Sequence, residues 1–161
     1  MADGILTREE MRREVVRLQA AGKKVVFTNG SFDVLHTGHL SYLRFAREQG
    51  DCLVVGLNSD ASVKGYKDAG RPIVPEADRA AMLAGLKPVD YVVIFSEAEP
   101  KELIACLQPD VLVKGEDWAH YVSGADSVTA RGGKVVLAPL VRGRSTTDIV
   151  KKILAAYGGR G

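Results

Sequence analysis

The chain has 161 residues, 46% of them hydrophobic, and a formal net charge of +2 at pH 7. This length and apolar content predict one folded domain with a continuous core and exclude a disordered chain. The small, mixed charge argues against a nucleic-acid partner. The sequence has neither an apolar stretch that could span a membrane nor the features of a signal peptide. We therefore expect a cytoplasmic protein that does not enter membranes, with Cys52 and Cys106 as buried thiols.

Residues 1–22 predict an N-terminal helix. Thr7 and Glu10 have the spacing of a capping box, apolar residues then recur on one helical face, and Gly22 ends the element. We expect this helix to serve packing or an interface rather than catalysis.

Short apolar runs alternate with helical patterns along the rest of the chain. The runs are continuous, as in strands buried on both faces, and cover residues 25–28, 53–57, 91–95, 111–113 and 135–138. Helical patterns cover residues 40–48, 76–86, 100–107, 122–130 (the weakest) and 147–157. This alternation predicts an α/β, Rossmann-like fold, with a doubly wound parallel five-stranded sheet in a single domain over 1–161. Residues 158–161 are expected to form a flexible tail.

Polar clusters follow four of the five expected strands, at residues 29–39, 58–67, 114–118 and 142–147. The carboxyl ends of parallel strands meet at one edge of the sheet, which is where open α/β sheets bind ligands. The sequence contains no Walker A and no G-x-G-x-x-G motif, so it supports neither a P-loop NTPase nor a dinucleotide-dependent oxidoreductase.

The first polar cluster contains His36 and His39 at the start of a helical pattern. Two imidazoles three residues apart lie on the same side of a first helical turn, whose unpaired N–H groups and dipole favour phosphate. Gly38 between them lets a ligand approach the backbone. A metal pair is the weaker interpretation, because the only other histidine is His120 and neither cysteine has a C-x-x-C partner. The pattern predicts a polyphosphate-binding loop.

The segment from Thr28 to His39, T-N-G-S-F-D-V-L-H-T-G-H, resembles the signature of the cytidylyltransferase-like nucleotidyltransferases, whose H-x-G-H motif binds the triphosphate of a nucleotide. Within that superfamily the chain is most similar to the D-glycero-D-manno-heptose 1-phosphate adenylyltransferases, through residues 57–63, 70–73, 77–79, 109–115 and 145–147. The resemblance runs from about Lys24 to Ile153. Many members are fused to a sugar-kinase domain, for which this chain has no room, so we expect a stand-alone form. Many relatives carry cysteine where this chain has Ser31, so no thiol chemistry is expected there.

The resemblance implies transfer of AMP from ATP to D-glycero-β-D-manno-heptose 1-phosphate, giving ADP-heptose for lipopolysaccharide biosynthesis, and pyrophosphate. The second pKa of a phosphate monoester is about 6, so the acceptor is ionised at neutral pH without a protein base. The protein must then align two anions and stabilise charge on the leaving oxygens. Two competing hypotheses are a cytidylyltransferase acting on glycerol 3-phosphate or a similar alcohol phosphate, and a non-catalytic nucleotide-binding module. Leu140 stands where the cytidylyl pattern has arginine, which favours the heptose group.

The resemblance also implies the residues of the site. His36 and His39 are the expected catalytic residues, together with Lys64 and Lys67 in a polar loop that could equally be a solvated connector. The expected nucleotide-binding residues are Asn29, Gly30, Ser31, Phe32, Gly38, Arg79, Lys114, Asp117, Trp118, Ser145, Thr146 and Thr147.

Several of these residues could instead have a structural role. Arg79 could be a surface residue, Trp118 could belong to the core, and the hydroxyls of 145–147 could cap the last helix. Asp33 either bonds to its own turn or reaches a Mg²⁺ held mainly by phosphates and water. We expect Mg²⁺ as the cofactor, ATP and a sugar 1-phosphate as ligands, and a homo-oligomer, either a dimer or a tetramer.

Overall fold

A five-stranded parallel sheet forms the centre of the chain in the computed structural model, which describes residues 4–159. Its strands are β1 (Val25–Gly30), β2 (Cys52–Asn58), β3 (Tyr91–Phe95), β4 (Val111–Gly115) and β5 (Lys134–Ala138), in the order β3-β2-β1-β4-β5. The chain moves outward from β1 to β3 and then returns to the other side of β1 for β4. This arrangement confirms the predicted doubly wound Rossmann-like sheet, and its order reverses between β1 and β4.

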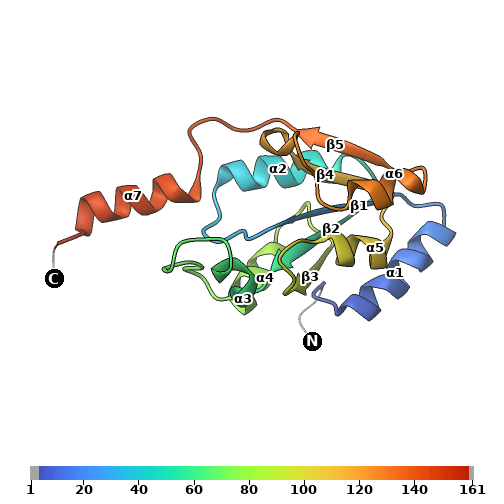
Figure 1. Ribbon diagram of the computed structural model, residues 1–161, viewed down its shortest axis with the longest axis horizontal. Helices are drawn as coiled ribbons and strands as arrows, with labels where there is room; N and C mark the ends of the chain where they lie inside the picture. The colour runs from blue at the N-terminus through green and yellow to red at the C-terminus, as the bar shows by residue number, and fades with distance from the viewer. Residues whose placement is uncertain (1–3, 160–161) are drawn as a thin grey trace.

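Helices cover both faces of this sheet (Figure 1). One face packs against α2 (Thr37–Arg47) and α4 (Glu76–Ala84), and the other against α1 (Arg8–Ala20), α5 (Lys101–Leu107) and α6 (Ala125–Ala130). Successive strand residues point to opposite faces, so Val26 and Val55 belong to the first cluster of core side chains and Phe27 and Val54 to the second. Burial on both faces explains why the strands read as continuous apolar runs.

The element boundaries differ from the sequence prediction mainly at the carboxyl edge of the sheet. The structure adds α3 (Asp60–Lys64) and a 3₁₀ helix (Glu116–Trp118) inside two of the polar clusters. The N-terminal helix begins at Arg8 after the predicted capping box of Thr7 and Glu10. Of the segments expected to form the N-terminal helix and the tail, residues 1–3 and 160–161 lie outside the described residues.

The last helix, α7 (Thr146–Tyr157), extends away from the sheet (Figure 1). Its first turn is held to the body by the hydroxyl of Thr146, which donates to the carbonyl of Val34 at 2.8 Å. None of its described residues is buried, and Ile153 and Leu154 are exposed. Across residues 4–159, no helix is both long enough and apolar enough to cross a bilayer.

Candidate active site

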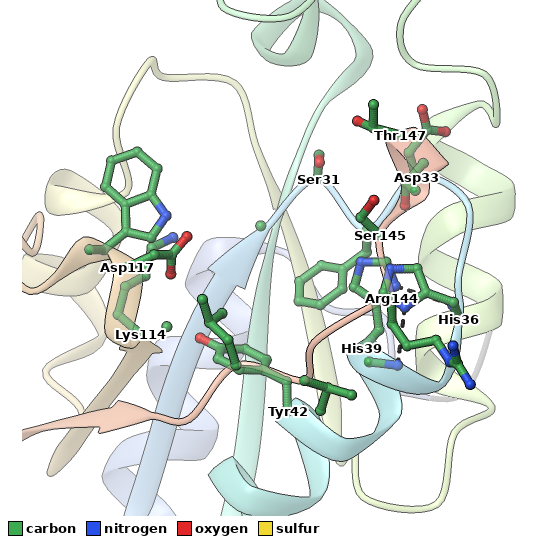
Figure 2. A pocket seen from close by; sticks show the side chains of 18 of the residues that line it. Ser31, Asp33, His36, His39, Tyr42, Lys114, Asp117, Arg144, Ser145 and Thr147 are labelled. Atoms are coloured by element: carbon green, nitrogen blue, oxygen red, sulfur yellow. Dashed lines mark hydrogen bonds between the residues drawn. The ribbon is translucent and has the colours of Figure 1, made fainter. Parts of the chain in front are cut away.

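A pocket of about 410 Å³ opens at the carboxyl edge of the sheet, over the ends of β1 and β4 (Figure 2). Every site residue predicted from the sequence lines this pocket, except Lys64 and Arg79. Those that line it are Asn29, Gly30, Ser31, Phe32, Asp33, His36, Gly38, His39, Lys67, Lys114, Asp117, Trp118, Ser145, Thr146 and Thr147. Segments that are far apart in the sequence therefore meet at the point where the strand order reverses.

The two histidines of the H-x-G-H motif cap the first turn of α2. The His36 Nδ1 accepts a hydrogen bond from the backbone N–H of Gly38 at 3.0 Å, and the His39 Nδ1 accepts one from the N–H of His36 at 3.2 Å. This is the geometry of a capping box, with imidazoles in place of the usual serine and glutamate. The two rings lie 3.9 Å apart, centroid to centroid.

These capping bonds determine the tautomer of both rings. A backbone N–H can only donate, so each Nδ1 is an unprotonated acceptor, and the single proton of the neutral ring lies on Nε2. Burial and the neighbouring His36 lower the pKa of His39 to about 4. Burial and the charge of Arg144 also lower the pKa of His36. At neutral pH both residues are therefore neutral donors through Nε2, held in place by the backbone.

The structure explains why position 38 of the motif is a glycine. A Cβ added there would lie 2.7 Å from Cε1 and 2.8 Å from Nδ1 of His36, and 3.1 Å from Cβ of Arg144. The glycine thus makes room for the His36 ring to reach its capping position. The preceding loop is also constrained, because Phe32 has a φ of 43° and packs beneath His39 with ring centroids 5.5 Å apart.

Asp33 anchors the segment 71–74 to the signature loop. Its carboxylate accepts hydrogen bonds from the N–H groups of Ile73 and Val74 at 2.8–3.0 Å, and Arg71 lies 3.8 Å away. The side chain is nearly buried. This arrangement favours a structural role for Asp33, because its oxygens already face these donors. Within residues 4–159, no group of three or more histidine, cysteine, aspartate or glutamate residues could hold a metal ion. The described side chains therefore form no complete metal site by themselves, and a Mg²⁺ would need ligands from the substrate phosphates and water.

Arg79 has a different environment from the surface or nucleotide-facing position predicted for it. The guanidinium is buried and donates to the carbonyls of Ser31 (2.6 Å), Asn58 (2.9 Å) and Val74 (2.8 Å). Its remaining contact is an ion pair with Asp60 at 2.7 Å. The prediction of direct nucleotide contact is therefore replaced by a positioning role: Arg79 ties the signature loop to the end of β2 and to the 71–74 segment.

Cationic side chains surround the pocket on several sides. Lys67 lines it, whereas Lys64 ends the short helix α3 and lies outside the lining. Lys114, at the end of β4, has a pKa lowered by burial and places its Nζ 5.2 Å from the centre of the Trp118 ring. Arg144 lies beside His36, on the same side of the pocket (Figure 2). Arg144 belongs to a polar cluster of the sequence, but no motif marks it as a site residue, because its position depends on where α7 begins.

Trp118 and Ser145 both contribute to the pocket wall. Trp118 is 46% exposed and lines the pocket, so it does not belong to the core. Ser145 is the N-cap of α7, because its hydroxyl accepts from the N–H of Asp148 at 3.0 Å. Since Ser145 and its neighbours also line the pocket, capping the helix and facing a phosphate are compatible roles for this segment.

A family model described as cytidylyltransferase-like matches residues 27–152. The chain belongs to the cytidylyltransferase-like family. The bifunctional protein HldE of Geobacter metallireducens is 56% identical over 141 residues, which cover 87% of this chain and 29% of that protein. HldE of Magnetococcus marinus is 50% identical over 155 residues, which cover 96% of this chain and 32% of that protein.

The chain therefore spans less than a third of the length of these curated relatives. A crystal structure of a lipopolysaccharide core biosynthesis protein from Thermoplasma volcanium GSS1 has the same fold. Its TM-score is 0.62 and its sequence identity 27%, covering 74% of this chain and 98% of that chain. Membership of the cytidylyltransferase-like family makes the pocket the candidate active site of a nucleotidyltransferase.

The positions of the two loop lysines predict different kinetic effects. Lys67→Ala removes a cation from the pocket, and we expect kcat/KM for the nucleotide to fall about tenfold to a hundredfold, the cost of losing a charged hydrogen bond. Lys64→Ala is the matched control, because it removes the same charge outside the lining, and we expect an effect below about twofold. Initial rates at varied nucleotide concentration measure both. An equal fall in kcat/KM in the two variants would contradict the assignment of Lys67, but not Lys64, to the pocket.

The lowered pKa of His39 predicts that the stability of the protein depends on pH. The pKa of His39 is about 6.5 in an unfolded chain and about 4 in the folded protein. Between these values the unfolded chain binds more protons, so the free energy of unfolding falls as pH falls from about 6.5 to 4, by up to about 3 kcal/mol. Above pH 6.5 the contribution is fully present. Urea unfolding at pH 7 and pH 5 measures it, and His39→Asn serves as the control without an imidazole. An unchanged difference between the two pH values in that variant would contradict the assignment.

Proposed function

We propose that this chain transfers the adenylyl group of ATP to D-glycero-β-D-manno-heptose 1-phosphate, giving ADP-heptose and pyrophosphate. The observation that carries the nucleotidyl-transfer chemistry is the pair of neutral Nε2–H donors at the start of α2, facing the same pocket as the first turn of α7. Two helix N-termini and the cations Lys67, Lys114 and Arg144 make this pocket suited to a polyphosphate.

The side chains in the pocket favour direct displacement. A phosphate oxygen of the acceptor attacks the α-phosphorus of the nucleotide, the bond from that phosphorus to the bridging oxygen breaks, and pyrophosphate leaves with the electron pair. The described residues that line the pocket include no cysteine and no Ser-His-Asp arrangement, and burial raises the pKa of Cys52 to about 12. His36 and His39 would donate to the phosphate oxygens as their charge increases, already oriented by the backbone.

The expected Mg²⁺ would reach the site with the triphosphate. Mg²⁺ in such sites is held largely by substrate phosphates and water, with few protein ligands. Asp33 is engaged with the backbone of 73–74, so no step of the proposal depends on its binding the ion. When bound, the ion would offset part of the triphosphate charge.

The adenine preference is supported by the pocket wall that follows β5. Pro139, Leu140 and Val141 line it, and Leu140 and Val141 are exposed. Leucine at position 140 cannot supply the fork of donors that a guanidinium offers to a base. An apolar wall discriminates weakly between bases, so we expect a preference for ATP with some use of other purine nucleotides.

The heptose substrate is supported by the sequence resemblance. HldE relatives are about half identical to this chain, and the structural neighbour is described as a lipopolysaccharide core biosynthesis protein. We also expect the reaction to take place in the cytoplasm, where ATP is available, and the protein to form a dimer or tetramer. Fractionation and light scattering would test these two expectations.

Pyrophosphate release, measured with four nucleoside triphosphates and several acceptors at equal Mg²⁺, tests the proposal. We expect ATP with heptose 1-phosphate to give the fastest turnover, CTP to be clearly slower, and glycerol 3-phosphate to be inert. Faster turnover with CTP and glycerol 3-phosphate would favour a cytidylyltransferase. Nucleotide binding without turnover on any acceptor would favour a non-catalytic binding module.

A further inference from the structure

A second cavity, of about 330 Å³, adjoins the active-site pocket. The two share Asn29, Gly30, Lys114 and Trp118 as a common wall. We call it the side cavity; the lining residues that matter to its chemistry are Asn58, Tyr66, Glu99, Trp118, Tyr121 and Ser123. They come from the end of β2, the segment after α3, the loop after β3, and the 3₁₀ helix with the segment that follows it.

The side cavity contains a buried hydroxyl that no described residue satisfies. Among the described residues, none makes a hydrogen bond of normal geometry to the buried Oγ of Ser123, although the Tyr121 side chain lies near enough to interact with it. Its neighbour Tyr121 donates from its hydroxyl to Glu99 at 2.7 Å. That bond is the main reason why the pKa of Tyr121 is raised, and the nearby Ser123 side chain opposes the shift. A buried polar group without a partner is costly, so a ligand hydroxyl that pairs with Ser123 would gain affinity.

The remaining polar groups of the side cavity suit a polyhydroxylated ligand. Glu99 offers carboxylate oxygens as acceptors, and Asn58 offers an amide oxygen, since its nitrogen donates to Ser62 at 2.9 Å. Sugar hydroxyls donate to such acceptors and accept from hydroxyl donors. By contrast, Lys114 is the only cation among the described residues that line the cavity, and Glu99 would repel a second phosphate. The charge pattern therefore favours an uncharged polyol over another anion.

Aromatic faces border the same space. Tyr66, Trp118 and Tyr121 are each about half exposed, at 52%, 46% and 50%. Half-exposed aromatic side chains combine an apolar face with a polar edge, and a sugar ring likewise has C–H faces bordered by hydroxyls. Small-molecule sites typically combine such apolar walls with a few fixed polar groups.

We propose that the side cavity binds the hydroxylated body of the acceptor sugar phosphate, with Lys114 at the boundary between the sugar and the reacting phosphates. This inference rests on the proposed function for the identity of the acceptor. Because the two cavities share a wall, a sugar in one would place its 1-phosphate next to the nucleotide in the other.

Kinetics of three variants test this assignment. We expect Glu99→Gln, Tyr121→Phe and Ser123→Ala each to raise KM for heptose 1-phosphate about tenfold, as the loss of one buried hydrogen bond would, and to leave KM for ATP within about twofold. Glu48→Gln, an exposed substitution at the end of α2, is the matched control for charge. A higher KM for ATP with an unchanged KM for the sugar would assign the side cavity to the nucleoside and overturn the proposal.

Ser123→Ala separates binding from folding. Removing an unsatisfied buried hydroxyl should leave the melting temperature unchanged or higher, so weaker sugar binding cannot then be attributed to unfolding. A loss of stability without a change in sugar KM would show that the hydroxyl is structural and would contradict the inference.

Tryptophan fluorescence distinguishes failure of this inference from failure of the proposed function. Trp118 is the only tryptophan in the chain and lies at the shared wall. We expect heptose 1-phosphate to change its emission at concentrations where inorganic phosphate does not, and Glu99→Gln to weaken that response about tenfold. If heptose 1-phosphate is turned over but these variants bind it normally, the side cavity is not the sugar site and the function stands. If no turnover occurs, the proposed function fails. If the tryptophan emission then responds only to a different sugar phosphate, the assignment of the side cavity as a sugar site stands. If it responds to no sugar phosphate, both the proposed function and this assignment fail.

Discussion

Replacing His39 or His36 with asparagine is expected to lower kcat about 10²–10³-fold while leaving the fold intact. Asparagine places an amide oxygen near the position of Nδ1, so it can still accept the capping hydrogen bond of α2. It cannot supply the donor at Nε2. The expected loss is that of one preorganised donor to a transition-state oxygen. Steady-state kinetics and thermal unfolding of the same samples measure the two effects separately.

His36→Ala and His39→Ala complete this comparison. Alanine removes both the cap and the donor, so we expect the same kinetic loss together with a drop in stability of about 1 kcal/mol. If the asparagine variants kept normal turnover and only the alanine variants were slow, the histidines would act through the helix cap alone. Their proposed role as phosphate donors would then be wrong.

Arg79→Ala is expected to cause the largest loss of stability in the chain, about 3–5 kcal/mol, as is usual when one partner of a buried ionic network is removed. Three carbonyl oxygens lose their donor, and a cavity replaces a buried guanidinium. This is a large fraction of the roughly 5–15 kcal/mol that stabilises a typical domain. Urea unfolding at 25 °C measures the effect.

Arg79→Lys and Arg13→Ala are the controls for this prediction. Lysine keeps the charge but cannot reach three carbonyls and Asp60 with one ammonium group, so we expect an intermediate loss of stability. Arg13 is exposed on α1, and its replacement should change stability by less than about 0.5 kcal/mol. If the Arg79→Ala variant were stable but had lost nucleotide binding, a direct contact between Arg79 and the nucleotide would be favoured over the positioning role.

The sheet and the main phosphate-binding loop were predictable from the sequence because their signals are local. Strands buried on both faces appear as apolar runs, and the H-x-G-H motif directly follows the first of them. The alternation of strands with helices then brings the polar segments after β1, β2, β4 and β5 to one edge of the sheet. In these respects, neighbouring residues determine the architecture of the site.

The tertiary structure decided which of these polar side chains face the pocket. Lys64 and Lys67 are three residues apart, yet only Lys67 lines it, because α3 turns the chain between β2 and the loop. Arg79 is buried and Trp118 exposed, although charge and apolar character alone suggest the reverse. Contacts with particular backbone N–H groups determine where the protons of His36 and His39 lie. The packing of separate segments likewise leaves the Ser123 hydroxyl without a well-placed partner among the described residues. Composition and periodicity indicate where an element lies, but the partners of a polar atom are set only when separate segments pack together.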